Sequence, residues 1–440
     1  MLLEFKTENF KSFVDEANFS MTAAPKQKGL DYSLLIPPKT IKNVKGICSA
    51  VIYGPNAVGK TNIIGAMDVF QSIVARGNIR NSSVDVTPNV AASSLELIPN
   101  HELQEAKPVK FYIDFVENGI RIQYLLKLDL GTFLDEEYPR KILEEALWLN
   151  EKQVFLRNDS LQINDSFKSP LYSFPASSET ANLTNIALKS LQQQELFLTN
   201  GFKLIFSQDI ANLVMNWFTN KFMVIYRADS MQLLRRFSDP HKNTAYIEKT
   251  TNDAAKLFGI SSNALGYVVD GEDSKVKLCS IFSKVKHNEH KAVLAEIFES
   301  FGTLRFINMF PIVIRALLTG GTLIVDEFDA SIHPMALMNI INIFHNSDIN
   351  KKQAQLVFNT HNPIFLNSNL FRRDEIKFVE RDEDSHESTL YSLADFGTAG
   401  ENGVRKHEDY MKNYFVSRYG ALRDIDFSPV LEEILSGSEE

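Results

Sequence analysis

The sequence has few of the features that mark extracellular or membrane proteins. Only Cys48 and Cys279 are cysteines among its 440 residues, which excludes a disulfide framework and a cysteine-rich metal site. No apolar run approaches the ~20 residues needed to span a bilayer, and the longest, 306–318, is interrupted by an asparagine, a proline and an arginine. The N-terminus lacks the apolar segment of a secretory signal. We therefore expect a soluble, cytoplasmic protein with no membrane partner.

An excess of positive charge is also absent. The chain has 46 Lys and Arg against 55 Asp and Glu, a formal net charge of −9. Proteins whose main task is to bind bare nucleic acid usually carry a basic surface, so the balance argues against that class and leaves room only for a local basic groove. Hydrophobic residues make up 44% of the chain, enough to fill two or three packed units.

What the sequence does contain is a phosphate-binding loop. The pattern G-x-x-x-x-G-K-[ST] is matched by Gly54, Pro55, Asn56, Ala57, Val58, Gly59, Lys60 and Thr61. A short apolar run, 47–53, precedes the loop, and 62–76 carries apolar residues at helical spacing. Strand, glycine loop and helix is the order that lets backbone N–H groups and a helix N-terminus surround a β-phosphate. The alternative is a chance match in a glycine-bearing turn, and the residues downstream argue against it.

Two residues of the loop and two acids far downstream have complementary chemistry. Lys60 can reach the β- and γ-phosphates, and the Thr61 hydroxyl can ligate Mg²⁺. The apolar strand 322–325 ends in Asp326 and Glu327. In a phosphate-loop protein the first acid holds the Mg²⁺ hydration shell, and the second polarises water for attack on the γ-phosphate.

A histidine follows the next buried strand. Residues 355–359 have strand character and are followed by Thr360 and His361. A histidine at this position can hydrogen-bond the γ-phosphate or the attacking water. A lone histidine is more often structural, but its place after the acidic strand favours a role at the phosphate.

A serine and a glycine open a long predicted helix just before the acidic strand. Residues 300–305 read Ser-Phe-Gly-Thr-Leu-Arg, and the helix continues through Leu318. Small residues at a helix start favour anion binding. Because loop 54–61 already surrounds the phosphates of its own subunit, we expect Ser300 and Gly302 to contact the γ-phosphate held by another subunit. An ordinary serine N-cap is the alternative.

The rest of the chain predicts an antiparallel lobe followed by a helical block. An Asn-Gly turn between two alternating runs is a strong hairpin signal. The predicted hairpins join 109–116 to 120–130 and 146–149 to 154–157. The predicted helices cover 181–198, 202–218 and 229–237.

The order of these motifs resembles that of the ABC-type ATPase heads of SMC, RecF and OLD proteins. Residues 8–13, Glu-Asn-Phe-Lys-Ser-Phe, are similar to the opening of the same group. Together with the loose signature Ser-x-Gly-Thr-x-Arg, residues 326–334 and 372–376 are most similar to the AAA-ATPase-like abortive-infection family. That family includes the RloA and AbiLi proteins and the ATPase of the PARIS phage-defence system. The tail 410–421 is also similar, whereas 160–275 shows little resemblance.

The resemblance implies an α/β fold, an ABC-type P-loop ATPase head whose mixed sheet carries an antiparallel β-lobe, with a helical insertion. We divide the chain into an N-terminal part of the head with the β-lobe (1–175), the insertion (176–260) and a C-terminal part of the head (261–440). The implied cofactors are ATP and Mg²⁺. By position, the catalytic residues are Lys60, Glu327 and His361, the metal residues are Thr61 and Asp326, and the contacts between subunits are Ser300, Gly302 and Asp329.

Two departures limit the resemblance. The glutamine that usually completes Mg²⁺ and water binding in such heads has no convincing position, since Gln71 falls within the predicted helix after the loop and Gln123 within a hairpin. The signature also lacks a second glycine and a glutamine, which predicts slow activation between subunits.

The leading hypothesis is the ATPase sensor of a two-gene antiphage module. ATP would assemble the heads into a homo-oligomer, the assembly would hold a separately encoded effector, and a phage-encoded trigger would release it. In this family the effector is commonly a TOPRIM-like or RloB-like protein. About 80 residues follow His361, without the acidic pattern of a TOPRIM nuclease. The block 178–257 and the tail after Tyr391 are the candidate contact regions.

Two other functions remain open. A DNA repair ATPase similar to RecF would need a basic groove, for which the best candidates are Arg227, Arg235, Arg236, His241 and Lys242. A helix with a solvated basic face explains this cluster equally well. A nucleotide-binding subunit of a membrane transporter is disfavoured by the degenerate signature and the long insertions.

Overall fold

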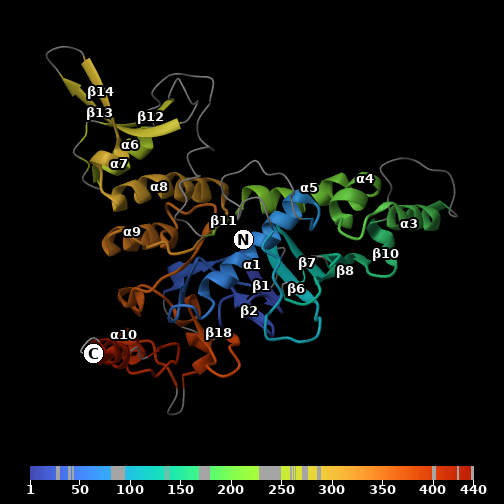
Figure 1. Ribbon diagram of the computed structural model, residues 1–440. Helices are drawn as coiled ribbons and strands as arrows, with labels where there is room; N and C mark the ends of the chain where they lie inside the picture. Colours follow the sequence, from blue (N-terminus) through green and yellow to red (C-terminus); the bar gives the residue numbers. More distant parts are fainter. Residues whose placement is uncertain are drawn as a thin grey trace.

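The computed structural model of the protein describes residues 1–25, 30–37, 41, 44–80, 95–133, 135, 138–167, 179–226, 249–257, 260, 262, 264–269, 276–284, 289–398, 403–423 and 426–437. Two large sheets form the body of the described structure (Figure 1). A smaller three-stranded sheet stands away from them beyond helix α8, and the C-terminal helices lie at the opposite end.

The central sheet has six strands in the order β11-β15-β16-β5-β17-β18. Their bounds are β5 (Ser49–Tyr53), β11 (Phe222–Ile225), β15 (Thr322–Val325), β16 (Gln355–Asn359), β17 (Ile376–Arg381) and β18 (Ser388–Ser392). All neighbours pair in parallel except β17 and β18, which are antiparallel. Strands β5, β15 and β16 are buried along their whole length, as expected where helices cover both faces of a parallel sheet.

One strand of this sheet lies inside the block predicted as a helical insertion. Strand β11 pairs in parallel with β15, Phe222 lying opposite Thr322. The block 176–260 is therefore not purely helical, because its residues 222–225 belong to the central sheet. The helix predicted at 229–237 lies outside the described residues.

The second large sheet is antiparallel and has the order β10-β9-β8-β7-β6-β1-β2. Its strands are β1 (Leu2–Glu8), β2 (Ala17–Ser20), β6 (Val109–Glu117), β7 (Ile120–Asp129), β8 (Lys141–Leu149), β9 (Lys152–Arg157) and β10 (Leu161–Ile163). Both predicted hairpins are confirmed as β6–β7 and β8–β9. Asn118 and Gly119 have φ values of 49° and 75°, the left-handed geometry that an Asn-Gly hairpin turn requires.

Helices fill the space between and around the sheets. Their bounds are α1 (Lys60–Arg76), α3 (Glu179–Ser190), α4 (Lys203–Ile205), α5 (Gln208–Asn220), α6 (Lys249–Leu257), α7 (Ala295–Phe298), α8 (Phe301–Thr319), α9 (Pro334–His345), α10 (Tyr410–Phe415) and α11 (Ser428–Gly437). A π-helix (Leu198–Phe202) precedes α4. The short pair β3 (Leu34–Leu35) and β4 (Gly46–Ile47) and the separate sheet of β12 (Ala264–Val269), β13 (Val276–Lys284) and β14 (Glu289–Leu294) complete the strands.

Alternate residues of the central sheet face two different cores. Ala50 and Ile52 of β5 belong to the core that contains α1 and the antiparallel sheet. Val51 and Tyr53 belong to the core that contains α8 and α9. Phe70 of α1 stacks on aromatic rings of the antiparallel sheet, so α1 is fixed between the two sheets with its N-terminus at the end of β5.

Helix α8 is long and apolar enough, by length and composition, to cross a membrane, and among the described residues it alone passes that test. Half of its apolar window is buried inside the protein. Its residues Ile307 and Val313 belong to the core shared with the central sheet, which is the arrangement of a core helix.

Candidate functional site

The phosphate-binding loop connects β5 to α1 and needs glycine at both ends. Gly54 and Gly59 have φ values of 153° and 111°, which other residues rarely adopt. A Cβ at Gly54 would lie 2.3 Å from the carbonyl oxygen of Val379, and one at Gly59 would lie 2.6 Å from Ser12 Oγ. The loop therefore passes close to β17 and to the N-terminal motif 8–13, and it ends at the N-terminus of α1.

Lys60 is folded back over the loop. Its Nζ donates hydrogen bonds to the carbonyl oxygens of Gly54 at 2.8 Å and Pro55 at 2.6 Å. Burial lowers the pKa of Lys60 to about 8, while Asp326 and Glu327 oppose that change. A phosphate bound in the loop would supply the negative charge that this buried ammonium lacks.

Thr61 and Asp326 lie together, as predicted for the metal residues. The Thr61 hydroxyl donates to Asp326 Oδ1 at 3.1 Å, and Asn359 Nδ2 donates to the same oxygen at 2.6 Å. A hydroxyl and a carboxylate are the hard oxygen ligands that Mg²⁺ prefers. Their position beside the N-terminus of α1 fits an ion that also contacts phosphate oxygens.

Glu327 has an exposed side chain and a tightly held backbone. Its φ of 50° is left-handed and unusual for this residue type. Its amide donates to Asn359 Oδ1, and its carbonyl oxygen accepts from the Arg305 guanidinium. The carboxylate therefore leaves the end of β15 from a defined backbone position, as a general base requires.

His361 lies at the same edge, next to a residue linked to Asp329. Thr360 Oγ1 donates to Asp329 Oδ2 at 2.6 Å, which ties the segment after β16 to the segment after β15. Partial burial lowers the pKa of His361 from its usual value, and Lys60 adds to the fall, whereas Asp329 and Asp326 raise it. The neutral imidazole is thus favoured, and it can donate one hydrogen bond and accept another.

Ser300 and Gly302 form the first turn of α8. The Ser300 side chain accepts from the amide of Thr303 at 3.1 Å, so it is an N-cap. A Cβ at Gly302 would lie 2.2 Å from the carbonyl oxygen of Ser331. The Ser300 contact lies within the first turn of α8, and the Gly302 contact is with the segment after β15. Neither is a contact with loop 54–61. The role between subunits therefore stays a prediction.

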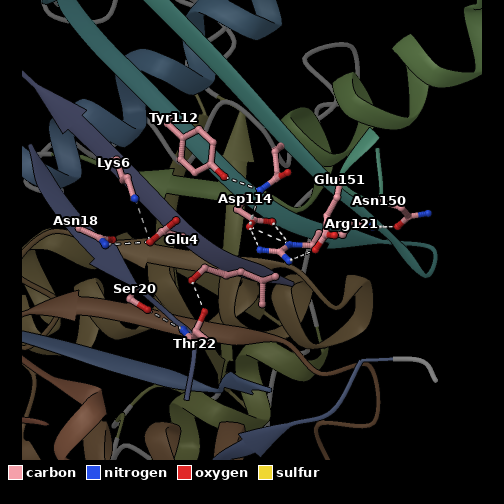
Figure 2. Close-up of polar contacts among 12 residues, drawn as sticks. Glu4, Lys6, Asn18, Ser20, Thr22, Tyr112, Asp114, Arg121, Asn150 and Glu151 are labelled. Atoms are coloured by element: carbon pink, nitrogen blue, oxygen red, sulfur yellow. Dashed lines mark hydrogen bonds and ion pairs between the residues drawn. The ribbon is translucent and has the colours of Figure 1, made fainter. Parts of the chain in front are cut away.

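The two glutamines considered for metal binding have other partners. Gln71 Nε2 donates to the carbonyl oxygens of Phe218 and Phe222, which connects α1 to α5 and β11. Gln123 Nε2 donates to Tyr112 Oη at 2.8 Å, on the polar face of the antiparallel sheet where Figure 2 shows Tyr112 beside Asp114. Neither side chain is directed at the phosphate-binding loop.

The structure adds residues that the sequence did not single out. Asn359 and Arg305 hold the acid pair. Asn359 ends the predicted strand 355–359 and Arg305 ends the signature 300–305, but the sequence pattern assigns neither residue a role. Lys11 lies near the start of α1 and donates to Glu96 at 2.7 Å and to Tyr226 Oη at 3.0 Å. Tyr226 directly follows β11, whose residue Ile225 accepts from the amide of Asp326 at 2.9 Å. The end of β11 therefore borders the site.

A second group of titratable side chains lies elsewhere. Potential ligand atoms of Cys48, His345 and Glu375 come within 4.8 Å of one another in the core. The Ser49 hydroxyl donates to Glu375 at 2.7 Å and is hydrogen-bonded to His345 Nε2 at 2.8 Å. Burial raises the pKa of Cys48 well above its usual value, so the thiol is protonated. Ser49, His345 and Glu375 therefore form an internal hydrogen-bonded group, and the Cys48 thiol lies beside it.

Comparisons with known proteins place most of the chain in one family. Residues 49–367 match the family described as "AAA domain, putative AbiEii toxin, Type IV TA system". The match begins with β5 and ends beyond His361, so it includes the loop, the acid pair and the histidine. None of the curated proteins matches the chain. Among solved structures the chain is similar to the SMC head domain from Thermotoga maritima, with 12% identity, 89% of this chain and 98% of that chain covered, and a TM-score of 0.34.

The family and the geometry agree on the coarse class of the protein. The predicted fold class, an α/β ABC-type P-loop ATPase head with a mixed sheet and an antiparallel β-lobe, is confirmed. Because the match covers well over half of the 440 residues, the chain belongs to this family of AAA domains.

Proposed function

We propose that the protein hydrolyses ATP with Mg²⁺ at the carboxyl edge of the central sheet. One observation carries the proposal: the hydroxyl of Thr61 and the carboxylate of Asp326 meet at 3.1 Å, at the point where β5, β15 and β16 end. Parallel strands bring the segments that follow them to one edge, and ligands of such sheets bind there.

Each residue then has one task. Lys60 exchanges its two carbonyl partners for phosphate oxygens. Thr61 and Asp326 would hold Mg²⁺, which would supply positive charge against the charge of the phosphate. Glu327 accepts a proton from the attacking water as the water oxygen bonds to the γ-phosphorus and the bond from that phosphorus to the β–γ bridging oxygen breaks, which releases ADP. His361, neutral at pH 7 because its pKa is lowered, hydrogen-bonds the γ-phosphate or the water.

The active form is an assembly of two or more copies. Ser300 is exposed at the start of α8, and exposed apolar side chains lie within three residues of it in the sequence: Ile297 at 76%, Phe298 at 47% and Phe301 at 62%. A patch of this kind favours contact with another protein surface. In such an assembly Ser300 and Gly302 contact a nucleotide held by the other copy, and Asp329 lies near the interface.

The wider role is that of a cytoplasmic sensor in an antiphage, abortive-infection module similar to those of RloA, AbiLi and PARIS. The family description names a toxin of a toxin-antitoxin system, which fits a defence function. The partner is a separately encoded effector, such as a TOPRIM-like nuclease, and a phage-encoded trigger controls it. The tail offers exposed apolar residues for such contacts, including Phe415, Val416 and Phe427.

The test is the mass of the purified protein in solution, with and without Mg·ATP, alone and with the product of the adjacent gene. We expect a nucleotide-dependent assembly that retains that product, together with release of phosphate from ATP. Absence of a complex under every nucleotide condition would reject the sensor role, and absence of phosphate release would reject the ATPase.

The alternative of a RecF-like DNA repair ATPase has no comparable support. Its candidate groove, formed by Arg227, Arg235, Arg236, His241 and Lys242, lies outside the described residues. Salt-sensitive DNA binding in the same solution experiment would favour it.

A further inference from the structure

The backbone of Glu327 lies between two side chains from different parts of the chain. Its amide donates to Asn359 Oδ1, and its carbonyl oxygen accepts from Arg305 Nη2. The same carbonyl accepts from the amide of Ala330 at 3.1 Å. A left-handed φ in a non-glycine residue persists only where its surroundings hold it, and these contacts supply that restraint.

The Asn359 contact fixes both acids together. Asn359 is only 1% exposed, and while its Oδ1 holds the amide of Glu327, its Nδ2 donates to Asp326 Oδ1 at 2.6 Å. Both groups of one side-chain amide are therefore used on consecutive residues. Any shift of Glu327 relative to Asp326 breaks one of these bonds.

The Arg305 contact comes from the helix that begins at Ser300. Arg305 is 9% exposed and lies within the second turn of α8. One turn earlier, Gly302 packs on the carbonyl oxygen of Ser331, which leaves no room for a Cβ. The first two turns of α8 thus contact both ends of the segment 327–331 that follows the acidic strand.

We propose that Arg305 and Asn359 are positioning residues for Glu327, and that Arg305 transmits the state of the Ser300 end of α8 to the base of its own subunit. The proposal rests on the ATPase function proposed above. Because a helix moves as a rigid rod over two turns, a displacement at Ser300 moves the guanidinium at Arg305. A contact made by a second copy at Ser300 therefore changes the placement of Glu327 without touching it.

The experiment compares Arg305→Met with Arg315→Met, the same substitution on the same helix. Arg315 lines a cavity with residues of α1, α5 and β11 and serves as the control. We expect kcat to fall about 10²-fold in Arg305→Met, the loss typical of a misplaced catalytic group, with nucleotide affinity within about twofold of wild type. Arg315→Met keeps the wild-type kcat. In a Glu327→Gln background, Arg305→Met has no further effect on the rate, because both changes act on one base.

Hydrogen exchange measures the contact without relying on activity. In the nucleotide-free protein, the peptide covering 326–332 should exchange about tenfold faster in Arg305→Met than in Arg315→Met, as expected for loss of a buried hydrogen bond to a charged donor. Arg305→Lys, which keeps the charge and loses the planar guanidinium, should give intermediate exchange and provides the test if Arg305→Met does not fold.

The outcomes separate the two proposals. The positioning role would be overturned if Arg305→Met kept both the wild-type hydrogen exchange of 326–332 and the wild-type kcat. It would also be overturned if Arg305→Met lowered nucleotide affinity and kcat by equal factors. A wild-type protein that releases no phosphate would reject the ATPase, and the exchange of 326–332 would still decide whether Arg305 holds Glu327.

Discussion

The Thr61 hydroxyl donates to the Asp326 carboxylate at 3.1 Å across 265 residues of sequence. Thr61 lies in the first turn of α1, after the phosphate-binding loop, and Asp326 directly follows strand β15. The chain between them includes strands β6 to β10 of the antiparallel sheet, strand β11, several helices and the separate three-stranded sheet. The pair therefore marks the position where the two parts of the chain form one site.

Replacing Asp326 by Asn should raise the Mg²⁺ concentration needed for half-maximal ATP hydrolysis by about tenfold or more. Substituting even the residues that only hydrogen-bond a metal ligand typically lowers metal affinity by about tenfold. The amide keeps the size of the side chain but removes the charge that attracts the ion. Thr61→Ser keeps the hydroxyl and should stay close to wild type. A Mg²⁺ titration of the ATPase rate measures both variants, and an unchanged midpoint in Asp326→Asn would remove Asp326 from the metal site.

Replacing Glu327 by Gln should slow hydrolysis by about 10²- to 10⁴-fold, the usual contribution of a general base. The amide cannot accept the proton from water, while the backbone contacts with Asn359 and Arg305 remain. ATP should therefore bind and the assembled form accumulate. Single-turnover phosphate release and mass in solution measure these effects. Hydrolysis at the wild-type rate would show that another group is the base.

Much of this site could be predicted because each of its motifs is a short continuous stretch of sequence. Loop 54–61 and the acid pair each follow a short apolar run, and a parallel sheet brings such strand ends together regardless of the residues between them. The hairpin at Asn118 and Gly119 was predictable for a similar reason, because the turn geometry depends on two adjacent residues. For these elements local sequence and final fold agree.

What the sequence could not provide depends on contacts between distant segments. Strand β11 is only four residues long and follows a series of helices. Its partner β15 lies about 100 residues further along the chain, so no local pattern identified β11 as a strand. Asn359 and Arg305 were missed because they bind backbone atoms of Glu327, and a backbone atom has no sequence pattern. Gln71 had no convincing position as a metal residue in the sequence, and its contacts with Phe218 and Phe222 place it between α1, α5 and β11.

Replacing Ser300 by Arg should prevent assembly while leaving ATP binding by the single subunit intact. The side chain lies at the exposed start of α8, and a long cation there would collide with a second copy. Ser300→Ala is the comparison variant: it also loses the hydroxyl, and with it the N-cap at a cost of about 1 kcal/mol of stability, but it adds no bulk or charge to the surface. Mass in solution with Mg·ATP distinguishes the two. Equal assembly in Ser300→Arg would remove the case for a shared site.

The last prediction concerns the stability of the nucleotide-free protein at alkaline pH. Burial lowers the pKa of Lys60 from 10.5 to about 8, so between these values the unfolded chain binds a proton that the folded chain has released. The contribution of Lys60 to the free energy of unfolding therefore rises as pH increases from about 8 to 10.5. The change amounts to about 3 to 4 kcal/mol at most, because each pKa unit between about 8 and 10.5 corresponds to about 1.4 kcal/mol.

Lys60→Met should remove this rise and stabilise the nucleotide-free protein below pH 8, because no charge is then buried in the loop. Lys152→Met, a substitution at an exposed position of β9, should leave the pH dependence as in wild type. Denaturant unfolding at pH 7 and pH 9 without nucleotide, with each variant compared with wild type, measures the difference. If Lys60→Met kept the wild-type dependence on pH, the ammonium would be solvated in the free loop, and its two carbonyl contacts would not hold it there.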